Sequence, residues 1–277
     1  MFFLYFCHKN LQMKFSVITI NYNNIEGLRH TIDSVVGQTY DDYEYIIIDG
    51  GSTDGSVDVI EKYDSKVSYW ISEKDRGIYH AMNKGVAQAH GDYCIFMNSG
   101  DFFYDSDALT KVSIMIAEED IVVGKVVIDE KNTIISPPPI SGELTLYHLY
   151  SGAIPHQGAF IKTDLLRKYP YDENLKISSD WKFFVQTLIH DNCSIRYLDV
   201  FVTHYDIHGF SSSNQELMRQ EKEKVLSSMF PSRVLVDYQH MKASECLTQS
   251  LTAQLRQHYK IDKFLYKLGL IMLKYFK

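Results

Sequence analysis

Short apolar runs alternate with amphipathic stretches between Lys14 and Asp101. The apolar runs are rich in β-branched residues, as buried strands are. The predicted strands lie near 14–22, 43–49, 67–72 and 92–97. Apolar residues at helical spacing separate them. The predicted helices lie near 25–37, 55–63 and 77–89. This alternation is typical of βαβ units, so we expect an α/β domain with a mostly parallel, Rossmann-like sheet flanked by helices.

The pattern becomes less regular after Asp101, and three prolines at 137–139 interrupt it. The predicted later elements are a helix near 106–118, strands near 121–123 and 157–161, a helix near 179–190 and a strand near 195–203. From Asn214 onward the sequence is polar and helical, without strand signals. We therefore expect three parts: an extension over 1–13, an α/β domain over 14–213 with halves 14–105 and 106–213, and a helical C-terminal appendage over 214–277.

Composition excludes several classes of protein. Of 277 residues, 45% are hydrophobic and 23% charged, which indicates a folded chain with a buried core. The net charge of −7 gives no overall positive field, so no nucleic-acid partner is expected. The four cysteines include no C-x-x-C pair, which argues against a disulfide framework or a zinc site and favours the cytoplasm.

Both ends of the chain carry apolar segments. The runs Met1–Cys7 and Phe264–Phe276 are shorter than the roughly 18–20 residues that span a bilayer, so no membrane crossing is predicted. The first run lacks the positive charge and the cleavage site of a signal peptide. Translation starting at Met13, or a short apolar anchor, would each explain it.

The tail over 260–277 holds five lysines and one aspartate. On a helix the lysines share one arc, with apolar residues on the other side. One interpretation is a basic amphipathic helix in peripheral contact with an anionic membrane surface. The other is a helix packed on the domain or on a second subunit in a homodimer.

Several known motifs are absent from the sequence. Gly50 and Gly55 have the spacing of a phosphate-binding loop, but Ser56 stands where the lysine is required. The same segment lacks the first carboxylate of a calcium loop and the closing glycine of a nucleophile elbow. Neither G-x-G-x-x-G nor H-E-x-x-H occurs. These absences argue against the chemistry that each motif serves.

Polar residues follow four consecutive predicted strands. They are Asn21, Tyr22 and Asn23, then Asp49, then Ser72 and Asp75, and finally Asn98, Ser99, Gly100 and Asp101. Turn formation explains any one of these loops alone. Four loops at the edge where open α/β sheets bind ligands, three of them with carboxylates, predict one binding crevice.

Five segments resemble a known family. They are Phe15–Asn23, Asp33–Val35 with Gln38–Tyr40, Tyr45–Gly55, Gly77–Gly85 and Phe96–Asp101. Together they resemble the nucleotide-binding half of family 2 glycosyltransferases of GT-A fold, in the branch that includes bacterial colanic acid and capsule glycosyltransferases. The resemblance is close over 14–105 and looser over 150–212. It implies an enzyme that transfers a sugar from a nucleotide sugar, without specifying the sugar.

The resemblance also implies a donor site. Asp49 is expected to accept the imide hydrogen of a uracil, which requires a group that only accepts. Tyr22 is expected to stack on the base or contact the ribose, with ordinary packing as the alternative. Asp75 would bind ribose hydroxyls, and Asn23 and Asn98 complete the expected nucleotide-binding set.

In this family the acidic motif after the fourth strand holds a divalent cation, Mg²⁺ or Mn²⁺. Here the motif is Asn98–Asp101, so Asp101 is the one remaining carboxylate. Because Mg²⁺ often uses only one or two protein carboxylates, Asp101 is the predicted metal ligand. His204 or His208 would supply a second ligand, and a structural role for either histidine is the alternative.

An inverting transfer also needs a base for the acceptor hydroxyl. The resemblance assigns this role to Asp180, at the start of a predicted helix. The alternative role is an N-terminal cap. His156 and Gln157 are weaker candidates on the acceptor side, and Asp164 and Asp172 are expected at the surface.

The functional hypothesis is a metal-dependent, inverting glycosyltransferase that uses a UDP-sugar and a lipid-linked or polysaccharide acceptor. It would act in cell-surface glycan synthesis, such as that of a capsule, in the cytoplasm or at the inner face of the membrane. The rival is a non-catalytic module that binds a sugar nucleotide or glycan. Metal-dependent hydrolysis of a UDP-sugar would separate the two. A nucleotidyltransferase would need a glycine-rich basic first loop, which 21–25 lacks.

Overall fold

The computed structural model describes residues 14–128, 133–135, 144–207, 214–258 and 269–273. The chain divides into two compact units, Met1–Val225 and Leu226–Lys277, and each is described by itself. The interpretations placed on 1–13, 137–139, His208 and most of 260–277 fall outside the described residues. Within the described ranges, no helix is both long and apolar enough to cross a membrane.

The first half of the first unit is a parallel sheet. Its strands are β1 (Phe15–Asn21), β2 (Tyr43–Asp49), β3 (Tyr69–Ser72) and β4 (Tyr93–Phe96). They lie in the order β3-β2-β1-β4, and every pairing among them is parallel. This confirms the four predicted strands, because buried parallel strands have the continuous apolar runs seen in the sequence.

The second half extends this sheet with mixed pairing. It contains β5 (Phe102–Phe103), β6 (Ile121–Ile128), β7 (Thr133–Ile135), β8 (Ala159–Lys162) and β9 (Ile195–Tyr205). β8 runs antiparallel to β4 and β6, whereas β6 and β9 are parallel. β5 and β7 are antiparallel to β9 and β6. The α/β class is confirmed; β5 and β7 were not predicted, because two or three residues are too short to show a period.

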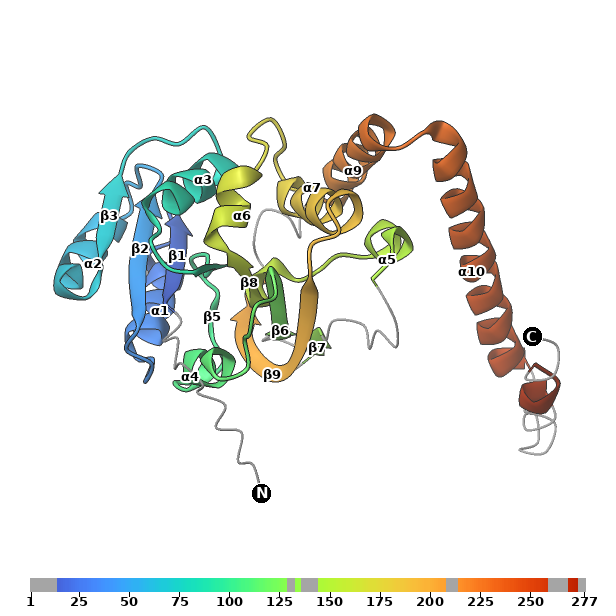
Figure 1. The fold of residues 1–277 in the computed structure, drawn as a ribbon, viewed down its shortest axis with the longest axis horizontal. Coiled ribbons are helices and arrows are strands. Elements are labelled where there is room, and N and C mark those ends of the chain that lie inside the picture. The colour runs from blue at the N-terminus through green and yellow to red at the C-terminus, as the bar shows by residue number, and fades with distance from the viewer. Residues whose placement is uncertain (1–13, 129–132, 136–143, 208–213, 259–268, 274–277) are drawn as a thin grey trace, which may run out of the picture. The chain divides into compact units, whose positions relative to one another are not determined.

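Helices flank the sheet on both faces (Figure 1). Those of the first unit are α1 (Ile25–Val36), α2 (Ser56–Lys62), α3 (Ile78–Gln88), α4 (Ala108–Ser113), α5 (Leu146–Ser151), α6 (Thr163–Lys168) and α7 (Ser179–Phe184), which continues as a π-helix over Val185–His190. Short 3₁₀ turns cover Asp64–Lys66 and His156–Gly158. α9 (Gln215–Met229) lies across the boundary between the units, and α10 (Ser232–His258) belongs to the second. α5 and α6 were not predicted.

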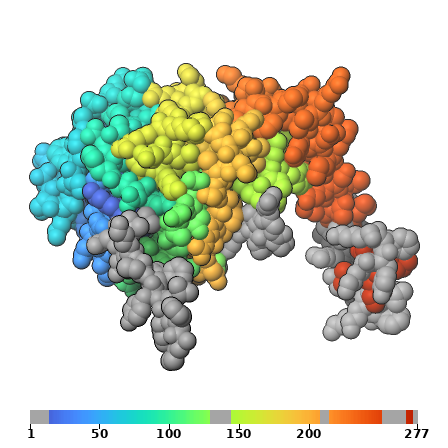
Figure 2. Space-filling model, in the orientation of Figure 1, coloured from blue at the N-terminus to red at the C-terminus, as the bar shows by residue number. Residues whose placement is uncertain are grey.

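Alternate residues of β1 serve the two faces of the sheet. Phe15 and Val17 join a core with the apolar side of α1, including Leu28. Ile18 faces α3, where a Cβ placed on Gly85 would lie 2.4 Å from its Cγ2. Glycine therefore allows the close approach of α3 to the sheet. α6 packs beside α3, and their outer surfaces are adjacent in Figure 2.

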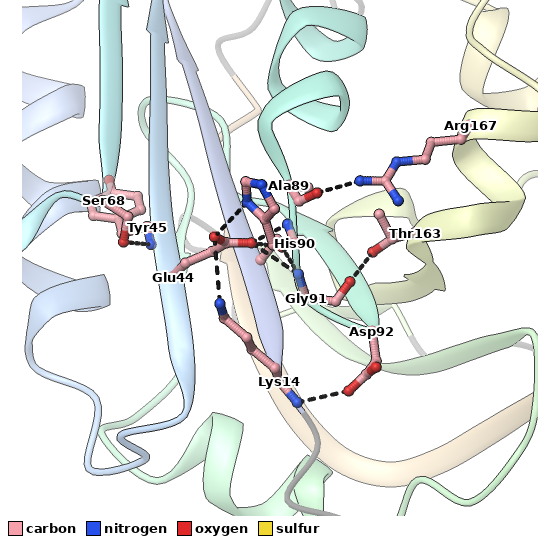
Figure 3. Close-up of polar contacts among 11 residues, drawn as sticks. Lys14, Glu44, Tyr45, Ser68, Ala89, His90, Gly91, Asp92, Thr163 and Arg167 are labelled. Carbon is pink, nitrogen blue, oxygen red and sulfur yellow. Dashed lines mark hydrogen bonds and ion pairs between the residues drawn. The ribbon is translucent and has the colours of Figure 1, made fainter.

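A buried carboxylate holds the edge of the sheet where the parallel strands begin (Figure 3). Glu44 Oε1 accepts hydrogen bonds from the Ser16 hydroxyl (2.6 Å), the Gly91 N–H (2.9 Å) and the His90 N–H. The Lys14 ammonium lies 3.8 Å from Oε2. Burial alone would raise the pKa of Glu44, but the hydrogen bonds and Lys14 lower it below its usual value. The contacts of Glu44 therefore join the starts of β1 and β2 to the turn before β4.

We expect Glu44→Gln to lower the free energy of unfolding at pH 7 by about 1–3 kcal/mol, because a charged acceptor of several buried donors is lost. A carboxylate with a depressed folded pKa stabilises above its unfolded pKa, near 4.3, and that contribution is lost as pH falls through the folded pKa. The gap between parent and variant should therefore shrink below about pH 4. Urea unfolding of the parent and the variant, at pH 7 and in acid, measures this difference in the free energy of unfolding.

The matched control is Glu61→Gln on the exposed side of α2, which should leave unfolding unchanged. An equal loss in both variants, or a gap that does not change with pH, would contradict the role of Glu44.

Candidate active site

The four predicted strand ends do meet at one edge of the sheet. Asn21 lies opposite Asp49, and Asp49 lies opposite Ser72. The loop after β4 joins them, because the Ser99 N–H donates to the carbonyl of Ile20 (3.1 Å). The register of the parallel strands thus places side chains from distant segments next to one another.

Asp49 is the centre of this group. Its Oδ1 accepts from Asn21 Nδ2 (2.7 Å) and the Ser52 hydroxyl (2.6 Å). Its Oδ2 accepts from the N–H groups of Gly51 (3.1 Å) and Ser52 (2.9 Å) and from the Ser72 hydroxyl (2.6 Å). Burial would raise the pKa of Asp49, but these bonds lower it. A carboxylate offers about four lone-pair sites, so a uracil imide could bind only where a hydroxyl donor turns away.

Asn23 forms hydrogen bonds with the loop that follows β2. Its backbone has φ +49°, a left-handed conformation that asparagine tolerates. Its N–H donates to the Ser52 hydroxyl (2.8 Å), and its Oδ1 accepts from the Thr53 N–H (2.8 Å). The side chain predicted to bind the donor thus holds the β1 and β2 loops together.

Tyr22 and Asp75 face the same point beside Gly50. The Tyr22 side chain is prominently exposed, at 68%. A Cβ placed on Gly50 would lie 3.2 Å from Tyr22 Cδ2 and 3.5 Å from Asp75 Oδ2. Asp75 Oδ1 is held by His80 Nδ1 (2.7 Å) and Lys84 Nζ (2.8 Å), while Oδ2 is buried and has no hydrogen-bond partner among the described residues. An acceptor without a donor next to an exposed ring suits a ligand hydroxyl or N–H.

Asp101 lies in the loop after β4 and is 4% exposed. Its Oδ1 accepts from the Asp206 N–H (2.9 Å), and the Asp206 carboxylate lies over Gly100, 2.8 Å from the position of an added Cβ. Burial and, to a smaller extent, the charge of Asp206 raise the pKa of Asp101 to about 7, against the lowering effects of the Asp206 N–H and of His156. Asn98 Oδ1, nearby in the same loop, is buried without a partner in the described part of the chain. Two adjacent carboxylates and an unpaired amide oxygen suit a hard cation.

His204 is the candidate second metal ligand that falls within the described residues. It lies in β9 opposite Phe102, and its ring is stacked on Phe102 (4.6 Å) and Tyr104 (5.1 Å). The carboxylate that the structure brings beside Asp101 is Asp206, two residues further along. The described residues include no group of three or more His, Cys, Asp or Glu side chains that could hold a metal.

Asp180 is the second residue of α7, and its side chain is 17% exposed. Its Oδ1 accepts from the Tyr79 hydroxyl (2.8 Å), and its Oδ2 lies 3.1 Å from His156 Nδ1. Burial would raise the pKa of Asp180, but His156 and Tyr79 lower it. The alternative role as N-cap is wrong, because Ser178 occupies that position. Tertiary partners hold the carboxylate instead.

Other candidates of the second half have structural surroundings. Gln157 is buried, at 8% exposure, beside His156. The Asp164 side chain is 94% exposed, as expected. Asp172, expected at the surface, is partly buried and pairs with Lys182 at 2.7 Å.

Glu221 of α9 fixes the segment that leads into α7. Its carboxylate accepts from the N–H groups of Lys176 (2.6 Å), Ile177 (3.0 Å) and Ser178 (3.0 Å). Three donors on one buried carboxylate set the entry of α7 and hence the position of Asp180. No local sequence signal marks this partner, since the residues lie more than 40 positions apart.

The segment Gly77–Gly85 contributes more than its resemblance indicated. Tyr79 holds Asp180, and His80 and Lys84 hold Asp75. Asn83 accepts from the Tyr171 N–H (2.9 Å) and donates to its carbonyl (2.9 Å). Helical spacing along α3 could have predicted that these residues act together, but not their partners.

The comparisons with known proteins agree with this geometry. The Glycosyl transferase family 2 model matches residues 16–169. A PGL/p-HBAD biosynthesis glycosyltransferase of Mycobacterium bovis is 30% identical over 203 residues, covering 70% of this chain and 77% of that protein. The crystal structure of S. aureus TarS 1-349 with UDP-GlcNAc is similar with a TM-score of 0.63 and 22% identity, over 79% of this chain and 68% of that one.

The mannosyltransferase PcManGT from Pyrobaculum calidifontis, in complex with GDP-Man and Mn²⁺, is similar with a TM-score of 0.56 and 17% identity, over 74% of this chain and 60% of that one. The expected GT-A fold is thus confirmed. With its family model matched over more than half of its length, the chain belongs to glycosyl transferase family 2.

Proposed function

We propose that this glycosyltransferase moves a sugar from a UDP-sugar to a lipid-linked or polysaccharide acceptor, with inversion at the anomeric carbon. The observation that carries the proposal is the partly buried Asp180–His156 pair, with Asp180 Oδ2 3.1 Å from His156 Nδ1. His156 lies within electrostatic reach of both Asp180 and Asp101, and so links α7 to the strand-end loops. This histidine–carboxylate pair, in electrostatic contact with the loop after β4, supports a site at which an acceptor hydroxyl could lose its proton.

Tyr22, Asp49, Asp75 and their neighbours support a nucleoside diphosphate donor. The exposed Tyr22 ring offers a stacking face, and Asp75 Oδ2 lacks a donor among the described residues. TarS, of similar fold, was crystallised with UDP-GlcNAc, which favours uridine. The relative from M. bovis is named for PGL/p-HBAD biosynthesis, which supports a role in cell-surface glycan synthesis.

Asp101, with Asp206 beside it, would hold a divalent cation, Mg²⁺ or Mn²⁺. Oxygen donors fit both ions. The structure of PcManGT with Mn²⁺ also supports a divalent cation. When bound, the cation would neutralise charge on the departing diphosphate.

The protein groups would act on the acceptor. Its hydroxyl would attack the anomeric carbon in line with the diphosphate, and the proton released must be taken by a positioned base. Asp180 supplies the negative charge for this step. Tyr79 and His156 orient it, and Glu221 holds the segment before it.

A panel of nucleotide sugars with Mg²⁺ or Mn²⁺ tests the proposal. We expect a UDP-sugar to raise the melting temperature and UDP to be released on incubation with metal, with water or an added glycan as acceptor. Binding without any release would favour the rival, a non-catalytic binding module of the same fold. Neither binding nor release with any UDP-sugar would contradict the donor assignment.

Asp49→Ala should weaken UDP binding more than tenfold, measured by isothermal titration, which corresponds to about 1.4 kcal/mol. The carboxylate either accepts the uracil imide or holds the β1 and β2 loops that surround the nucleotide, and alanine does neither. The exposed Asp58→Ala variant of α2 is the control. Equal UDP affinity in parent and Asp49→Ala would contradict the role of Asp49.

Ser72→Ala separates the two ways in which Asp49 could act. It removes one donor from Asp49 and leaves the Asn21, Gly51 and Ser52 bonds in place. Direct contact with uracil predicts that UDP affinity is kept or improves, since one lone pair becomes available. A loss of affinity would instead assign Asp49 to holding the loop.

A further inference from the structure

The two nitrogens of His156 have different surroundings. Nδ1 lies 3.1 Å from Asp180 Oδ2. Nε2 is buried and has no hydrogen-bond partner in the described part of the chain. A carboxylate beside Nδ1 favours the tautomer with the proton on that nitrogen, which leaves a lone pair on Nε2. A buried lone pair without a donor indicates a ligand proton at that point.

Asp180 itself is a weak proton acceptor in this arrangement. Each of its oxygens already faces a donor, the Tyr79 hydroxyl or His156 Nδ1. Donors of this kind stabilise the ionised form and make it less basic. General bases work best when their pKa lies near the working pH. The pKa of Asp180 is lowered, and that of His156 is raised above its usual value, because Asp180 and Asp101 outweigh the effect of burial.

We propose that Nε2 of His156 removes the proton from the attacking hydroxyl, and that Asp180 fixes the imidazole tautomer and stabilises the imidazolium. This inference rests on the proposed transfer reaction. The O–H bond breaks as the oxygen forms a bond to the anomeric carbon, and the bond from that carbon to the diphosphate breaks with its electron pair. The proton on Nε2 passes to solvent after the product leaves.

The same use of a histidine and a carboxylate is known from catalytic triads, where the carboxylate orients the imidazole and is not itself protonated. Here the turn at His156–Gly158 packs against β4, β6 and β9. Asp180 of α7 and Asp101 after β4 are the charged groups that act on the imidazole. Among the titratable side chains of these strands, Tyr93, Cys94, Lys125, Arg196, Asp199 and His204 contact other groups. The Tyr197 hydroxyl of β9 is buried without a hydrogen-bond partner among the described residues.

Nitrogen NMR of ¹⁵N-histidine-labelled protein tests the arrangement without any substrate. The chain has 11 histidines, and the signals missing from His156→Gln identify His156. At pH 8 we expect the proton on Nδ1, and we expect Asp180→Asn to lower the pKa of His156. A proton on Nε2 would overturn the proposal, since that nitrogen could then accept nothing.

Kinetics of UDP release from a UDP-sugar, with water as acceptor, tests the role itself. His156→Gln should lower kcat by about 10²–10⁴-fold and leave UDP affinity unchanged. The parent's kcat should fall about tenfold per pH unit below the His156 pKa, because imidazolium cannot accept a proton. His240→Gln, at an exposed position of α10, should match the parent.

Chemical rescue distinguishes proton transfer from packing. Imidazole added to His156→Ala should restore part of the turnover, more strongly at pH 8 than at pH 6. If Asp180 is the direct base, His156→Gln keeps most of the parent's activity at pH 8, which would overturn the proposal. A parent that binds a UDP-sugar without turnover refutes the proposed function instead, and the tautomer then still decides whether Nε2 can accept a proton.

Discussion

Asp180→Asn is expected to lower kcat by about 10²–10⁴-fold while UDP affinity stays unchanged. Asparagine carries no charge, so it can neither take a proton nor stabilise an imidazolium on His156. Folding should change little, because the amide oxygen can still accept from His156 Nδ1 and the Tyr79 hydroxyl can accept from the amide nitrogen. Initial rates measure kcat, titration with UDP measures affinity, and the melting temperature measures folding stability.

The control for this variant is Asp164→Asn, because the Asp164 side chain is 94% exposed. This substitution should change neither kcat, nor UDP affinity, nor the melting temperature. A variant at Asp180 that transfers sugar at nearly the parent rate would show that the base lies elsewhere. Asp206, beside Asp101, would be examined next.

Asp101→Asn should abolish metal-dependent transfer and yet stabilise the metal-free protein at pH 8. Asparagine lacks the charge that a divalent cation requires, so activity is lost, while UDP binding without metal persists. Burial raises the folded pKa of Asp101 to about 7. An acid with a raised folded pKa makes the protein less stable as pH rises between its unfolded and folded pKa values. The neutral amide removes this penalty.

Thermal unfolding in a chelator from pH 5 to pH 8 measures the effect. About 1 kcal/mol of relieved burial cost corresponds to roughly 2–4 °C in a domain of this size. The gain should disappear toward pH 5, where the parent carboxyl is itself protonated. The exposed Asp41→Asn variant is the control. Full transfer by Asp101→Asn in excess chelator, or a lower melting temperature at pH 8, would contradict this assignment.

The first four strands and three helices could be predicted because their signal is local. β1, β2 and β4 are apolar runs buried on both faces, β3 at the edge is partly buried, and the helices between the strands have a repeating apolar side. β5 and β7 are too short for such a signal, and α5 and α6 have only six residues each. Their helical or extended state depends on the neighbours that they pack against.

The candidate residues of the site were also predictable, because parallel strands bring their carboxyl ends to one edge. Their partners were not. Asp49 is occupied by loop donors, Asp75 is held from α3, and His204 is stacked between aromatic rings. The alternative of an N-cap at Asp180 was wrong, because the helix begins one residue earlier with Ser178 as its cap, and Tyr79 and His156 hold the Asp180 carboxylate.

The sequence by itself determined the alternation of strands and helices and the polar ends of the strands, since both depend on residues within a few positions of one another. Only the tertiary structure decided which polar and charged groups form hydrogen bonds or ion pairs with one another. Tyr79 meets Asp180 across 101 residues, and the N–H of Asp206 meets Asp101 across 105. Basicity depends on burial and on the donors and charges within a few ångströms, and those neighbours are set by how distant segments pack.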